Sequence, residues 1–189
     1  MGVAEGSGNW QRRAKGCGCL LLVFVALPFL LLRACQWSDA HPSDSAMIQE
    51  FRRSQTAFSD LRTMVTEEQR VTRVAKDFIW IDGAQNVSEA ERPNYLPDDR
   101  LARYRTLFEK LKLESGVVRY EDGSVGFLRS SSGIVTSGSS KEFIWSPGMS
   151  APVLASSDQR SLEEACVPKS GCSSIRQIAP DWFISFESD

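Results

Sequence analysis

The fold of this chain is decided by the stretch Val117-Val118-Arg119-Tyr120-Glu121-Asp122-Gly123-Ser124-Val125-Gly126-Phe127-Leu128-Arg129. Two apolar runs flank an Asp-Gly pair. This is the strongest short signal for a β-hairpin, because both positions of a two-residue turn need positive φ. The sequence therefore predicts antiparallel strands at 117–120 and 125–129, joined by a tight turn.

A second hairpin and a closing strand are expected downstream. Ile134-Val135-Thr136 and the aromatic run 142–145 flank a turn at Ser137-Gly138-Ser139-Ser140, and Pro147-Gly148 ends the second strand. The remaining expected elements are a short strand at 153–154, a short helix at 158–165 and a closing strand at 182–186.

Two amphipathic helices are predicted before these strands. Apolar residues recur at helical spacing over 45–70 and over 97–115, and Gly116 is the expected stop of the second helix. A strand at 77–82 and a loop at 84–97 separate them. The order predicts an α+β domain in which both helices pack on one face of an antiparallel β-sheet. The apolar stripe of the first helix is expected to face that sheet, with partner binding as the alternative.

An uncharged apolar run near the N-terminus predicts a membrane helix before this domain. Arg12, Arg13 and Lys15 precede the run at 17–32 and only Arg33 follows it, so the positive-inside rule places the N-terminus in the cytoplasm. The chain is thus expected to cross the cell membrane once. The predicted organisation is a cytoplasmic tail at 1–16, a transmembrane anchor at 17–37, a linker at 38–45 and an extracytoplasmic α+β domain at 46–189.

The same run also fits a cleaved signal. Leu32-Arg33-Ala34-Cys35 resembles a bacterial lipoprotein signal ending before Cys35, which would then carry the lipid. Arg33 departs from that pattern, because small or apolar residues are usual there. Both an uncleaved anchor and a lipoprotein signal remain open at this point.

Composition limits the partners of the exported part. The chain has 22 basic and 24 acidic residues, and residues 1–35 contain four of the basic and one of the acidic residues. The part beyond residue 35 therefore has 18 basic and 23 acidic residues, a net charge of −5. A nucleic-acid surface needs clustered Lys and Arg, and no basic run occurs there. The sequence predicts one domain beyond the anchor, the membrane as a partner and no nucleic acid.

Two cysteines near the C-terminus suggest a crosslink. Cys166 and Cys172 are separated by five residues, and in an oxidising compartment this spacing favours a disulfide. Free thiols are the alternative. A zinc site would lack ligands, because the chain has a single histidine. No metal site is therefore predicted.

The serine-rich segment 130–141 is the candidate ligand loop, with Ser137, Ser139, Ser140 and Lys141 as its polar residues. Its glycine spacing is that of a phosphate loop, but Ser139 stands where that loop needs a lysine, so no cofactor is predicted. A hydrolase would use a serine of 130–140 activated by Lys141. His41 lies in the predicted linker, so we expect no Ser-His-Asp arrangement inside the domain.

A succession of motifs runs through residues 46–155. It comprises Tyr104-Arg105-x-Leu107-Phe108, the segment 111–116, the Asp-Gly hairpin, and Ser-Ser-Gly and Ser-Gly-Ser-Ser-Lys before an aromatic strand. The order resembles a family of uncharacterised bacterial membrane-anchored envelope proteins, in which Gly and an aromatic residue often follow Ser-Ser-Lys where Glu142-Phe143 stands here. The resemblance implies a bacterial host and an extracytoplasmic domain, and brings no activity, cofactor or catalytic residue. We therefore expect a non-enzymatic envelope domain that binds another envelope protein or a cell-wall component, with an envelope-polymer hydrolase as the alternative.

Overall fold

A computed structural model describes residues 41–83, 85–134, 137–149, 154, 159–166 and 171–188. Residues 41–189 form one compact unit. The predicted tail, the anchor and Cys35 lie outside the described residues. Within the described part, no helix is both long enough and apolar enough to span a membrane.

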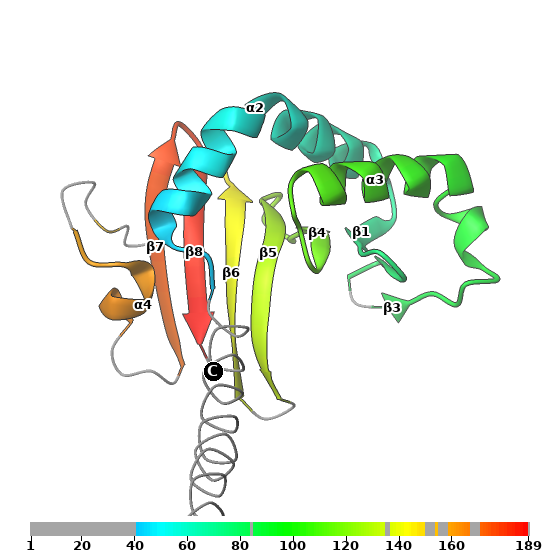
Figure 1. Ribbon diagram of the computed structural model, residues 1–189. Coiled ribbons are helices and arrows are strands. Elements are labelled where there is room, and N and C mark those ends of the chain that lie inside the picture. Colours follow the sequence, from blue (N-terminus) through cyan, green and yellow to red (C-terminus); the bar gives the residue numbers. More distant parts are fainter. Residues whose placement is uncertain are drawn as a thin grey trace, which may run out of the picture. The chain divides into compact units, whose positions relative to one another are not determined.

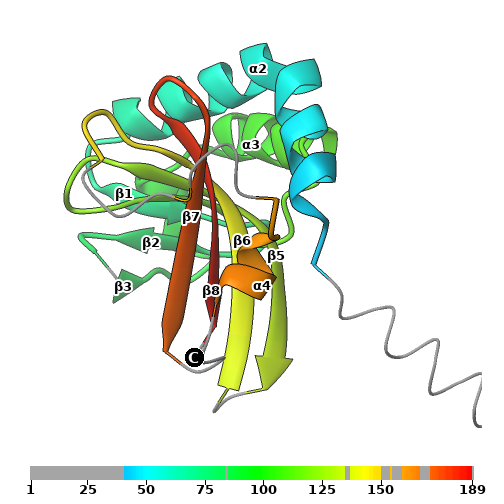
Figure 2. The same ribbon diagram turned by 90° about the vertical axis from the view of Figure 1, so that its left-hand side faces the viewer.

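The described unit is a mixed α+β domain built on one eight-stranded sheet, as Figures 1 and 2 show. The strands follow the spatial order β3-β2-β1-β4-β5-β6-β8-β7, and every neighbouring pair is antiparallel. Their bounds are β1 Val71–Val74, β2 Ile79–Ile81, β3 Gln85–Asn86, β4 Gly116–Arg119, β5 Val125–Ile134, β6 Ser137–Trp145, β7 Cys172–Ala179 and β8 Trp182–Ser188.

The first predicted hairpin is confirmed as β4 and β5, but its turn differs from the prediction. Gly123 alone among the turn residues has a positive φ, of 83°. The Asp122 carboxylate accepts hydrogen bonds from the Ser124 backbone N–H at 2.9 Å and from its hydroxyl at 2.6 Å. Tyr120 N–H donates to Ser124 O at 2.9 Å, so the loop has three residues and ends on a left-handed glycine.

The second hairpin is longer than predicted. β5 and β6 stay paired as far as Gly133 with Gly138 and Ile134 with Ser137. The predicted turn at 137–140 is therefore wrong, because those residues belong to β6. The reason is tertiary: β6 lies between β5 and β8, and Ser139 and Ser140 pair with β8 as well. Backbone pairing on both sides overrides the weak strand preference of Gly and Ser.

Four helices accompany the sheet in the described residues. They are α2 Asp44–Glu67, the 3₁₀ helix η1 Arg92–Asn94, α3 Asp98–Lys110 and α4 Leu162–Ala165. α2 begins one residue earlier than predicted, because the Ser43 hydroxyl accepts a hydrogen bond from Ala46 N–H and caps it. The predicted linker thus includes the start of this helix.

The end of α3 corrects another expectation. Gly116 does not stop the helix, but begins β4. The helix ends instead in a Schellman motif, in which Leu113 N–H donates to Phe108 O at 2.9 Å and Lys112 N–H to Glu109 O at 3.2 Å. Lys112 occupies the left-handed position of this motif with a φ of 52°.

The apolar stripe of α2 packs on the sheet, as predicted. The Phe58 ring lies 4.7 Å from the Phe143 ring and 5.4 Å from the Phe127 ring, between centroids. The Phe51 ring lies 4.9 Å from that of Trp182. These aromatic contacts join α2 to β5, β6 and β8, and Figure 1 shows the helix arching across these strands.

Candidate functional site

The predicted ligand loop does not exist as a loop. Because side chains alternate along a strand, Ser139 and Lys141 share one face of β6 with Phe143, and Ser140 lies on the opposite face. The side chain of Ser137 lies outside the described part. The four candidate residues are therefore not gathered into one site.

Lys141 is fully buried, and its Nζ lies close to three oxygen atoms. Its Nζ lies 2.6 Å from Asp44 Oδ1, 2.6 Å from Glu163 Oε1 and 2.9 Å from Pro42 O. Burial alone would raise the pKa of Glu163, but the hydrogen bond and charge of Lys141 outweigh it and lower that pKa. Pro42 O and Glu163 Oε1 accept hydrogen bonds from Nζ, whereas Asp44 Oδ1 forms an ion pair with it and accepts no hydrogen bond. We call these four residues the Lys141 clasp.

The clasp joins three distant parts of the chain. Pro42 and Asp44 lie at the start of α2, Lys141 lies on β6, and Glu163 lies on α4. A capping box holds α4 in place, with the Ser161 hydroxyl accepting from Glu164 N–H and the Glu164 carboxylate from Ser161 N–H. The Lys141 side chain thus links these three parts of the domain.

His41 corrects the expectation that it lies outside the domain. Its Nδ1 lies 2.7 Å from Ser130 Oγ and its Nε2 lies 2.8 Å from Ser139 Oγ. The ring meets Phe186 edge-on at 5.5 Å. Burial is the largest effect on this group and lowers its pKa, which favours the neutral ring. One nitrogen then donates to a serine and the other accepts from the second serine.

The Ser-His contact has part of the geometry of a catalytic pair. In a triad, the second ring nitrogen donates to a carboxylate that orients the imidazole. Here Ser130 and Ser139 occupy both nitrogens of His41, and no carboxylate contacts the ring among the described residues. The sequence did not reveal this contact, because 89 residues separate His41 from Ser130.

The predicted cysteine pair lies at disulfide distance. The Sγ atoms of Cys166 and Cys172 are 2.01 Å apart and their Cα atoms 5.6 Å apart. The pair connects the end of α4 to the start of β7, and the Ser174 hydroxyl donates to Leu162 O at 2.8 Å beside it. The crosslink therefore holds α4, which carries Glu163, against the sheet. Over the residues that the structure describes, no group of three or more His, Cys, Asp or Glu side chains is placed to hold a metal ion.

A buried acid on the opposite face of the sheet was not predicted. The Tyr120 hydroxyl donates to Glu142 Oε2 at 3.1 Å, and the Ser185 hydroxyl lies 3.4 Å from Oε1. A Cβ atom on Gly126 would lie 2.5 Å from Glu142 Oε2 and 2.8 Å from the Tyr120 hydroxyl. The absence of a side chain at Gly126 on β5 therefore leaves room for the Tyr120 hydroxyl to reach Glu142 on β6. Burial raises the pKa of Glu142 to about 7.

The raised pKa makes stability depend on pH. The folded state binds a proton at Glu142 more tightly than the unfolded state, so the free energy of unfolding falls as pH rises from about 4.5 to about 7. We expect the fall to be on the order of 2–3 kcal/mol. Glu142→Gln should remove most of it and stabilise the protein at pH 8. Urea unfolding at pH 5 and pH 8 measures this. Glu121 is an exposed carboxylate in the same hairpin, so Glu121→Gln should keep the pH dependence of the wild type. If the free energy of unfolding of Glu142→Gln still fell with pH as in the wild type, Glu142 would not be the group responsible.

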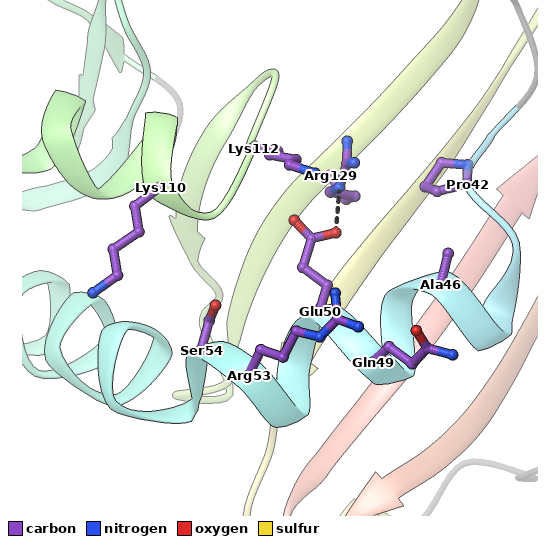
Figure 3. A pocket seen from close by; sticks show the side chains of 9 residues that line it. All are labelled: Pro42, Ala46, Gln49, Glu50, Arg53, Ser54, Lys110, Lys112 and Arg129. Carbon is purple, nitrogen blue, oxygen red and sulfur yellow. Dashed lines mark hydrogen bonds and ion pairs between the residues drawn. The ribbon is translucent and has the colours of Figure 1, made fainter.

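A basic cavity of about 360 Å³ lies between the first half of α2, the end of α3 and β5 (Figure 3). Four cationic side chains face it against the single carboxylate of Glu50, a net charge of +3. Its lining residues are Pro42, Ala46, Gln49, Glu50, Arg53, Ser54, Lys110, Lys112 and Arg129. The sequence showed no basic run because these charges come from three separate segments. We call this space the α2–α3 cavity.

The geometry thus offers two local features, a buried polar crosslink around Lys141 and an open basic cavity that shares Pro42 with it. The first is fully buried at Lys141, whereas the second has room for a small ligand. The chain matches no protein-family model, no curated protein and no solved structure. The resemblance of residues 46–155 to a family of envelope proteins therefore stays a prediction.

Proposed function

We propose that this protein is a single-pass membrane protein whose α+β domain lies outside the cytoplasm and binds another envelope component without catalysing a reaction. The anchor at 17–37, or a lipoprotein signal ending before Cys35, supplies the attachment. A cysteine pair at disulfide distance is compatible with an oxidising compartment. In this proposal α2 and α3 cover one face of the sheet and leave the α2–α3 cavity open for a ligand from another envelope protein or the cell wall.

One observation carries the non-enzymatic part of this proposal. Lys141 Nζ donates hydrogen bonds to Pro42 O and Glu163 Oε1, forms an ion pair with Asp44 and is fully buried, which argues against its activating a serine or meeting a substrate. A lysine base requires a neutral amine within reach of the nucleophile. In the clasp, the Lys141 Nζ instead forms ion pairs with Asp44 and Glu163.

The location has a direct test. A reporter enzyme that is active only outside the cytoplasm, fused after Asp189, should be active in cells, because the basic flank at 12–15 retains the N-terminus inside. A cytoplasm-dependent reporter at the same position serves as the control. Activity of the second reporter and silence of the first would overturn the proposed topology.

The hydrolase remains the second candidate because of the contact between His41 and its two serines. An activated serine reacts covalently with a fluorophosphonate probe, so labelling of the full-length protein in detergent micelles separates the two functions. We expect no labelling. Labelling that disappears in Ser139→Ala or Ser130→Ala, and in His41→Gln, would establish the hydrolase instead.

A further inference from the structure

The α2–α3 cavity combines unpaired positive charges with an oxygen that has no partner. Arg129 Nε pairs with Glu50 Oε2 at 3.1 Å. Within the described segments, Arg53, Lys110 and Lys112 have no such partner. Glu50 Oε1 is buried and has no hydrogen-bond partner there either. The three cations without a partner therefore attract an anion to the cavity.

The backbone holds Lys112 in an unfavourable conformation at this cavity. It occupies the left-handed position of the Schellman motif, where glycine is preferred because a Cβ atom costs about 1 kcal/mol. In this conformation Lys112 lines the same cavity as Arg129, as Figure 3 shows. Strained residues of this kind are concentrated at functional positions.

The shape of the cavity depends on a kink in α2. Ser54 has non-helical angles, with φ at −126° and ψ at 19°, in the middle of the helix, and it lines the cavity. The kink turns the first half of the helix, which carries Glu50 and Arg53, relative to the second half. Most of the lining residues thus lie on α2, α3 and β5, and Pro42 and Lys112 flank the ends of the two helices.

We infer that the α2–α3 cavity binds a phosphate ester through its phosphate group, with glycerol phosphate as a simple representative of this ligand class. The cations Arg53 and Lys112 bind the phosphate oxygens through charge-assisted hydrogen bonds. A phosphate group suits several donors better than a carboxylate, because it presents more acceptor oxygens. This inference rests on the proposed binding function and names the ligand class for it.

The test uses full-length protein in nanodiscs of phosphatidylcholine and isothermal titration with glycerol phosphate. Arg53→Gln combined with Lys112→Gly should weaken binding at least about ten-fold. Lys112→Gly relieves the left-handed strain, so this variant should fold at least as well as the wild type. Arg52→Gln removes the adjacent exposed cation, which does not line the cavity, and should bind as the wild type does. Glycerol alone should not bind.

A second set of nanodiscs containing phosphatidylglycerol identifies the source of the ligand. Competition by this lipid would assign the cavity to a membrane headgroup, and no competition would assign it to a soluble or polymeric glycerol phosphate. Either result supports the inference if the Arg53→Gln, Lys112→Gly variant loses binding. Absence of glycerol phosphate binding without competing lipid, or equal binding by the wild type and this variant, would overturn it. The topology and probe-labelling results would stand unaffected.

Discussion

Replacing Gly116 by alanine is expected to destabilise the domain by about 3–4 kcal/mol, a large share of the 5–15 kcal/mol that holds a typical domain together. A Cβ atom at this position would lie 2.0 Å from Val74 O and 2.9 Å from Ala75 Cα. Both are backbone atoms of β1 or of its end, so neither moves aside as a flexible side chain would. The substitution must therefore separate β4 from β1 and disturb the sheet at its centre.

Gly123 provides a matched control for this substitution. Both glycines have a φ of 83°, so alanine is conformationally strained to the same degree at either position. No heavy atom lies within 4 Å of the Cβ position at Gly123. Gly123→Ala should therefore cost only about 1 kcal/mol. Thermal unfolding followed by circular dichroism measures both, and equal losses would show that steric contact with Val74 is not the cause.

Removing the charge of Lys141 is expected to cost about 3 kcal/mol. Lys141→Met keeps the length of the side chain and its apolar packing, but leaves Asp44 and Glu163 without the cation that neutralises them. Asp44 retains an ion pair with Arg176 at 3.4 Å, whereas Glu163 has no second ion pair among the described residues. Chemical denaturation at pH 7 measures the loss of stability.

The double variant Lys141→Met, Glu163→Gln tests the electrostatic cause. Neutralising Glu163 should restore about 1 kcal/mol of the lost stability, because the unpaired carboxylate is then absent. A double variant no more stable than Lys141→Met would show that the loss comes from packing. In that case the clasp would not be the feature that holds α4 to the start of α2.

The local sequence was sufficient where one element carries its own signal. Asp122-Gly123 predicted the first hairpin, and the apolar periodicity of 45–70 predicted α2 and its packing on the sheet. The pairing of Cys166 with Cys172 was predicted from their short spacing and the expected oxidising compartment, and the two cysteines lie at disulfide distance. These signals depend on neighbours within a few residues along the chain.

Other elements had no local signal. β1 and β7 were not predicted, since Val71–Val74 is too short to show a pattern and β7 contains four polar residues among its eight. The serine-rich half of β6 was assigned to a turn for the same reason. Each of these strands exists because a neighbouring strand pairs with its backbone, and side-chain patterns do not report that pairing.

By itself, the sequence determined the α+β class, the antiparallel hairpins and the helix that covers them, because hydrophobic periodicity and turn residues act locally. Only the tertiary structure decided the chemistry of the sites. It brought His41 to Ser130 and Ser139, enclosed Lys141 between two carboxylates, and gathered the cations of the α2–α3 cavity from three segments. Charges and hydrogen bonds act over a few ångströms in space. Whether two residues that are remote in sequence come this close is decided by the packing of the whole domain, and no local sequence pattern encodes that.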